Sequence, residues 1–153
     1  MFITKQVTAD DKLYYRPVLA IKCSEKACNL LQSHFQGHTS LSPGTSHKVG
    51  KWTCSGKGLV RPLQKMLPFL QEAKPAARIV LEAAKWFLLP TKRRYISVGR
   101  TFCGVRVGDR IINKNISIKE ISEPFRREME SLRVELDTIQ ANFFKLGGWL
   151  SQA

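Results

Sequence analysis

Alternating apolar and polar positions predict strands in the first third of the chain. In residues 14–23 the odd-numbered side chains are the more apolar set, whereas the even-numbered set includes Arg16 and Lys22. Because the side chains of a strand point alternately to its two faces, this segment predicts a buried row and an outward row. Residues 48–55 repeat this pattern, and residues 3–7 form a shorter strand candidate. In the strand at residues 48–55, Trp52 and Cys54 are expected to point inward, and Val49, Lys51, Thr53 and Ser55 outward.

Three segments between residues 24 and 90 carry apolar side chains at helical spacing. Ser24 is suited to cap the first helix, and Gly37 ends it. Pro75 suits the first turn of the third helix, and Pro90 ends that helix. The three apolar stripes are Ala27, Leu30, Leu31 and Phe35; Leu59, Leu63, Met66, Leu67 and Leu70; and Ile79, Val80, Ala83, Ala84 and Phe87. Strands and helices together predict a mixed α/β (α+β) fold.

The last third of the chain has a different character. Residues 92–94 (KRR) form a basic hinge, and residues 95–121 predict short strands and loops. The expected breakers in this segment are Gly99, Gly104 and Gly108. We therefore expect a core at residues 1–91 and an extension at residues 92–153 that ends in an amphipathic helix capped by Ser122.

This final helix carries an apolar seam with a 3.5-residue period. The seam consists of Phe125, Met129, Leu132, Leu136, Ile139, Phe143 and Leu146. Such a seam has two readings. It can pair with the same helix of a second subunit to form a homodimer, or it can cover the core of its own domain.

The charge of the chain is high and unevenly distributed. There are 25 Lys and Arg against 12 Asp and Glu, a formal net charge of +13. Residues 26–71 and 83–108 contain no acidic residue at all. A solvated surface usually mixes both signs, so these stretches favour a polyanionic partner. Nucleic acid fits this charge pattern better than an acidic lipid surface does.

Other classes of protein find little support in the sequence. No apolar stretch approaches the length of a membrane span, and the N-terminus does not resemble a signal peptide. The scattered cysteines are typical of reduced thiols, so we expect a reducing intracellular compartment, whether organellar, bacterial or phage-derived. The Cys23, Cys28, His34 and His38 set is too closely spaced for a usual zinc finger. No nucleophile motif, phosphate loop or converging carboxylate pair is present.

The outward strand rows are the candidate binding surface. A twisted antiparallel sheet can lie in the major groove of DNA, where side chains from its outer face reach base edges. We expect Arg16, Lys22, Lys51 and Thr53 to contact duplex DNA. The full set of predicted DNA-binding residues is Lys5, Arg16, Lys22, Lys48, Lys51, Thr53, Ser55 and Lys57.

Several short segments carry a resemblance to a known family: 2–6 (FITKQ), 19–22 (LAIK), 30–37 (LLQSHFQG), 50–56 (GKWTCSG), 61–63 (RPL), 67–70 (LPFL) and 77–81 (ARIVL). In these segments and in the order of its elements, the chain resembles the LAGLIDADG homing endonucleases. The half-unit of that family has a motif helix, two strands, a helix, two strands and closing helices. The resemblance covers residues 2–90, and its most specific part lies in the last three segments.

The resemblance implies a saddle-shaped antiparallel sheet backed by helices and, in the family, Mg-dependent cleavage of DNA. The motif helix with its metal-binding carboxylate is missing here, so we expect DNA binding without efficient cleavage, and magnesium only if that helix lies upstream of Met1. The family places a basic partner three residues after Pro-Phe-Leu. That position is Ala73 here, and Lys74 follows as the candidate.

Two further functions are compatible with the sequence. Intron-encoded relatives of the family assist splicing, so the same basic surface would suit a cofactor that binds structured intron RNA. The apolar seam would instead suit a helix-mediated protein-interaction module.

Overall fold

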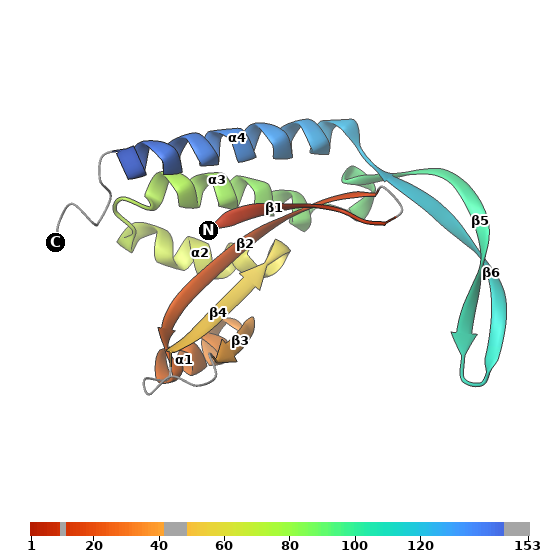
Figure 1. Ribbon diagram of the computed structural model, residues 1–153, viewed down its shortest axis with the longest axis horizontal. Coiled ribbons are helices and arrows are strands. Elements are labelled where there is room, and N and C mark those ends of the chain that lie inside the picture. The colour runs from red at the N-terminus through yellow and green to blue at the C-terminus, as the bar shows by residue number, and fades with distance from the viewer. Residues whose placement is uncertain (10–11, 42–48, 146–153) are drawn as a thin grey trace.

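A four-stranded antiparallel sheet lies at the centre of the fold (Figure 1). The computed structural model describes residues 1–9, 12–41 and 49–145. The strands are β1 (Phe2–Val7), β2 (Leu13–Ser24), β3 (His38–Leu41) and β4 (Val49–Ser55). They lie side by side in the order β1-β2-β4-β3. The predicted α+β class, with an antiparallel sheet backed by helices, is confirmed.

Helices cover one face of this sheet. Helix α3 packs against β2 and β1, and α1 packs against β2, β3 and β4. The α-helices of the described part are α1 (Glu25–Phe35), α2 (Val60–Met66), α3 (Lys74–Lys85) and α4 (Glu123–Lys145). Short 3-10 turns lie at η1 (Gly56–Leu59), η2 (Leu67–Phe69), η3 (Trp86–Leu88) and η4 (Thr91–Arg93). None of the helices in the described ranges is both long and apolar enough to cross a bilayer.

The predicted two-faced strands are confirmed. Along β2 the side chains of Tyr15, Pro17 and Leu19 are buried, whereas Arg16 and Lys22 are exposed. Trp52 and Cys54 of β4 are likewise buried. The inner rows of the two strands therefore form the core, and the outer rows remain in contact with solvent.

Helix α1 begins and ends as its sequence predicts, but its buried face differs. The Ser24 hydroxyl accepts a hydrogen bond from the Ala27 amide at 3.2 Å. At the other end Gly37 has φ +88, and a Cβ there would come within 2.7 Å of both the Thr53 carbonyl oxygen and Trp52 Nε1. Leu30, predicted to face the core, is 53% exposed, and Cys28 is fully buried in its place.

Residues 95–121 form one long hairpin instead of the short strands expected. Its strands are β5 (Tyr95–Val107) and β6 (Arg110–Ile121). Gly108, at φ +61, lies in the tight turn, as a breaker would. Gly99 and Gly104 lie inside β5 and do not interrupt it; the register shift falls between Ser97 and Gly99. The prediction failed because Gly99 is accommodated by this irregularity, and Gly104 pairs in register with Asn113.

Helix α4 covers the core of its own domain, which favours the second of the two readings of its apolar seam. Phe125 and Met129 are fully buried, Leu136 is 2% exposed and Leu132 is 7% exposed. Ile139 packs against the same core, while the side chains of Phe143 and Leu146 lie outside the described residues. A seam already buried within the chain cannot pair with another subunit unless the domain opens. It also joins the C-terminal helix to the core of residues 1–91.

Candidate nucleic-acid interface

The outer face of the four-stranded sheet brings the predicted binding residues together. Strand register places Lys22 directly opposite Lys51, and Ala20 opposite Thr53. Arg16 lies on the same face, opposite Thr4 of β1. Both Lys22 and Lys51 are exposed. Like charges directly opposite one another on adjacent strands destabilise a sheet, by about 0.2–1 kcal/mol. This pair is therefore unfavourable for the free protein, and an anion lying over it would relieve the repulsion.

No acidic residue shares this face in the described strands. Its rows are Phe2, Thr4 and Gln6; Tyr14, Arg16, Val18, Ala20 and Lys22; Val49, Lys51, Thr53 and Ser55; and His38 and Ser40. Cations and neutral hydrogen-bonding groups are thus mixed with apolar and aromatic side chains. The face has the chemistry required to contact phosphates and base edges together.

Lys5 lies apart from this face, and its predicted contact with DNA stays a prediction. It lies opposite Tyr15, on the inner row. Its Nζ is 2.7 Å from a carboxylate oxygen of Glu130 on α4. The Tyr15 hydroxyl donates a hydrogen bond to the same oxygen. Donation from Lys5 and then from Tyr15 lowers the pKa of Glu130, and burial followed by the Glu130 contact raises the pKa of Tyr15 to about 12. Lys5 therefore joins β1 to α4.

The other residues predicted to bind DNA or to serve as a basic catalytic partner lie in different parts of the fold. The Thr53 hydroxyl lies on the outer face, where it donates to the His38 carbonyl oxygen at 3.4 Å. Lys57 is exposed in η1, just beyond the end of β4. Lys74 is the half-buried first residue of α3 and so lies in the helical layer. Lys48 lies outside the described residues.

A cavity of about 750 Å³ extends the basic surface beyond the sheet. It is lined by Arg16, Ser55, Gly56, Lys57, Phe87, Leu88, Leu89, Pro90, Thr91 and Arg94. Arg94 donates through Nη1 to the Trp86 carbonyl oxygen at 3.1 Å, and its guanidinium carbon is 4.3 Å from the centre of the Phe87 ring. Its Nε is buried without a hydrogen-bond partner. Because no acid lines the cavity, cationic surface continues from the sheet to the root of the hairpin.

Several of these residues were missed by sequence reasoning. Thr4, Gln6 and Ser40 lie on the outer face only because of the register of β1 and β3. Arg94 was read as part of a hinge. Pairing register is a tertiary property, and the alternation of β2 and β4 alone does not reveal it.

Metal ligands do not assemble in the described part of the chain. No three His, Cys, Asp or Glu residues there could hold an ion together. Cys23 and Cys28 do meet, with their sulfur atoms 2.9 Å apart. Burial, followed by contact with Cys28, raises the pKa of Cys23 to about 11. The described strands of the outer face carry no carboxylate, the side chain that usually binds magnesium. These residues therefore do not fit a magnesium site.

Comparison with known proteins finds similarity in structure but not in sequence families. No family model and no curated protein matches the chain. One similar crystal structure is the homing endonuclease I-CvuI with the I-CreI target and magnesium, described as revealing DNA not cleaved. It is 18% identical with a TM-score of 0.45, over 57% of this chain and 58% of that chain. Another is I-CvuI with its own target and calcium, 16% identical with a TM-score of 0.49, over 95% of this chain and 86% of that chain.

Proposed function

We propose that this protein binds duplex DNA with the outer face of its four-stranded sheet. The observation that carries the proposal is the direct pairing of Lys22 with Lys51 on a face without acidic residues. A protein without an anionic partner would gain stability from an acid at either position. A phosphate backbone supplies the missing negative charge, and it does so repeatedly along the length of the sheet.

The remaining chemistry of the face suits sequence recognition. Hydroxyl and amide groups at Thr4, Gln6 and Ser40 stand among the cations. Lysine and arginine side chains contact phosphates and guanine, whereas glutamine is suited to adenine and hydroxyls to several bases. The sequence resemblance to LAGLIDADG homing endonucleases supports the same use of the sheet. We therefore propose sequence-specific recognition of a DNA groove.

The proposal concerns binding. Cleavage in the resembled family uses a metal-binding carboxylate, and the described residues of the outer face offer no carboxylate in a position to serve. We therefore assign no cleavage step to these residues.

Salt-dependent titration with three nucleic acids tests this function. The probes are fluorescent duplex DNA of random sequence, the corresponding single strand, and a folded intron RNA. The proposal expects the duplex to bind most tightly, with log K falling linearly against log salt by about 0.9 for each phosphate contacted. Tighter binding of the RNA would favour the splicing-cofactor function instead. Failure to bind any duplex at low salt would reject DNA binding.

A further inference from the structure

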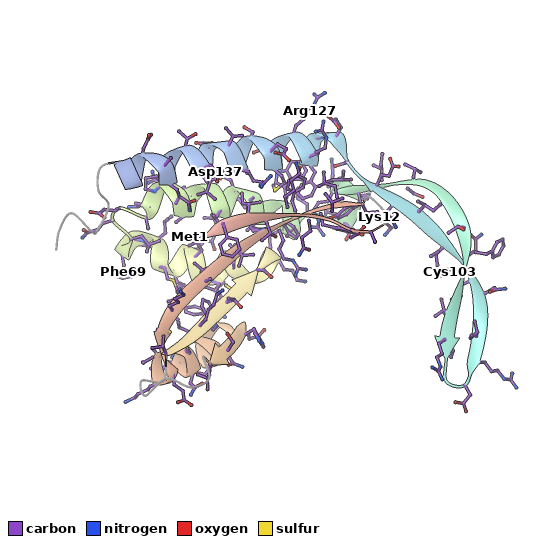
Figure 2. The ribbon with its side chains drawn as sticks, viewed as in Figure 1. Met1, Lys12, Phe69, Cys103, Arg127 and Asp137 are labelled. Carbon is purple, nitrogen blue, oxygen red and sulfur yellow. The ribbon has the colours of Figure 1, made fainter. Side chains whose placement is uncertain are left out.

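The β5–β6 hairpin extends from the core and leaves both of its faces uncovered. In Figure 1 it leaves the helical layer on one side of the molecule and bends toward the side on which β2 and β4 descend. Figure 2 shows its side chains, around the labelled Cys103, standing away from the other elements. Only its root is anchored: the ring of Tyr95 lies 5.9 Å from that of Tyr14 and 6.2 Å from that of Phe125.

Cross-strand register sorts the hairpin side chains onto two distinct faces. Residues directly opposite one another share a face, as do alternate residues along each strand. One face, called here the Arg/Asn face, carries Arg100, Phe102, Arg106, Ile111, Asn113, Asn115 and Ser117. The opposite face carries Thr101, Cys103, Val105, Val107, Arg110, Ile112, Lys114, Ile116 and Ile118.

The Arg/Asn face has no role in folding that the structure reveals. Arg100, Arg106, Asn113 and Asn115 are all exposed, and the side chains of Phe102 and Ile111 are 75% and 76% exposed. An isolated two-stranded hairpin is only marginally stable in water. A long ribbon that buries little and presents two arginines and two asparagines is better explained by a partner than by packing.

Charge identifies the class of that partner. Between residues 97 and 119 the only acidic residue is Asp109, in the turn, and the Arg/Asn face has none. Basic residues in the same segment are Arg100, Arg106, Arg110, Lys114 and Lys119. Arginine forms bidentate hydrogen bonds with guanine, and asparagine forms them with adenine. Phe102 and Ile111 can contact thymine methyl groups or unstack a base step.

We propose that the hairpin is a second DNA-reading element, whose Arg/Asn face enters a groove of the same duplex that the sheet binds. This inference rests on the proposed function of the sheet. The major groove admits a two-stranded ribbon. The nine residues from Gly99 to Val107 span about 30 Å, close to one helical turn of DNA. The cavity lined by Arg16, Lys57 and Arg94 gives a cationic connection between the two elements.

A charge-matched pair of variants tests the proposal in the full-length protein. One variant is R100A/R106A, on the Arg/Asn face; its control is R110A/K114A, on the opposite face, which removes the same charge from the same exposed ribbon. The probe is a duplex of about 40 base pairs, roughly four helical turns, selected from a random pool by binding to the wild-type protein. We expect R100A/R106A to weaken binding by about 10- to 100-fold and the control by about 3-fold or less.

Asparagine variants test whether the hairpin reads sequence. N113A/N115A should reduce the preference for the selected duplex over a scrambled duplex by about 10-fold or more while leaving affinity for the scrambled duplex nearly unchanged. Footprinting should show that R100A/R106A loses protection at the outer end of the site and retains it where the sheet binds.

The possible results separate this inference from the function on which it rests. Equal weakening by R100A/R106A and R110A/K114A would overturn the inference, because charge alone would then explain the effect. Wild-type affinity of R100A/R106A and unchanged discrimination by N113A/N115A would overturn it as well, while R16A/K22A/K51A would still weaken binding through the sheet. Absence of duplex binding by the wild-type protein would instead reject the proposed function itself.

Discussion

The four-stranded sheet and the β5–β6 hairpin use the same secondary structure in opposite ways. Both are antiparallel and rich in basic residues, and both have alternating side chains. In the sheet, one face is buried beneath helices, so its inner row holds the domain together and its outer row is available to a partner. The hairpin is anchored only at its root, so nearly all of its side chains are exposed. The same alternation of side chains therefore gives the sheet one buried face and one solvent-exposed face, whereas it leaves both faces of the hairpin exposed to solvent.

This difference predicts where substitutions will unfold the domain. A glutamate at the buried position Leu136 places an unpaired charge in the apolar core, so Leu136→Glu should lower the free energy of unfolding by about 4 kcal/mol or more. Val134→Glu is the control on the same helix, because Val134 is 64% exposed and should change stability by less than about 0.5 kcal/mol. Urea denaturation measures both. A folded, monomeric Leu136→Glu protein would restore the homodimer hypothesis.

An aromatic substitution in each region sharpens the comparison. Trp52 in the sheet is fully buried, and its Nε1 donates to the Gln36 carbonyl oxygen at 2.7 Å. Trp52→Ala should therefore cost about 3–5 kcal/mol. Phe102→Ala in the hairpin should leave the midpoint of thermal unfolding nearly unchanged, because the ring is 75% exposed. A large loss of stability in Phe102→Ala would show that the hairpin supports the core.

The polar contact between β1 and α4 should add a smaller, pH-dependent contribution. Glu130→Gln should destabilise the fold by about 1 kcal/mol at neutral pH, because it removes the charge that Lys5 and Tyr15 contact. Lysine and tyrosine donors lower the pKa of Glu130 in the folded chain. Its contribution is therefore present above the ordinary carboxyl pKa of 4.5 and lost as the pH falls through the lower folded value.

At alkaline pH the stability should fall as the pH rises, which is the opposite direction to the effect of Glu130. The folded-state pKa of Tyr15 is raised from 10.0 to about 12, so its contribution holds below pH 10 and is lost as the pH rises toward 12. Denaturation of the wild type and of Glu130→Gln across both ranges measures these contributions. Parallel pH profiles for the two proteins would contradict the role assigned to Glu130.

The smallest global effect should come from the turn of the hairpin. Gly108 has φ +61, so Gly108→Ala strains the turn by about 1 kcal/mol. Because the hairpin lies outside the core, amide hydrogen exchange in β5 and β6 should accelerate while the unfolding midpoint of the domain stays unchanged. Accelerated exchange in β2 or β4 would show that the two regions unfold together.

The features that sequence alone predicts correctly depend on local patterns. Alternation assigned the rows of β2 and β4, and Ser24 and Pro75 marked the starts of helices where the structure has them. Three features of the structure could not be predicted from the sequence, because they depend on tertiary contacts. Lys5 has a basic side chain like its neighbours in the binding set, and only its register and the position of Glu130 place it on the inner face.

The apolar seam of α4 illustrates the same limit. Its 3.5-residue spacing is identical whether the seam meets a second subunit or the core of its own chain. Only the packing of α4 against α3 and β1 shows that it covers the domain. In the hairpin, Gly99 and Gly104 have the composition of strand breakers, but cross-strand pairing accommodates both.

The central claim, that the outer face of the sheet binds duplex DNA, is tested most directly by two charge-matched triple variants. R16A/K22A/K51A removes three cations from the outer face, whereas R61A/K65A/R78A removes three exposed cations from α2 and α3. Affinity for the selected duplex should fall by at least about 100-fold in the first variant, with a salt slope lower by about three. The second variant should bind within about 5-fold of the wild type. Equal losses in the two variants, or none in the first, would contradict the assignment of DNA binding to this face.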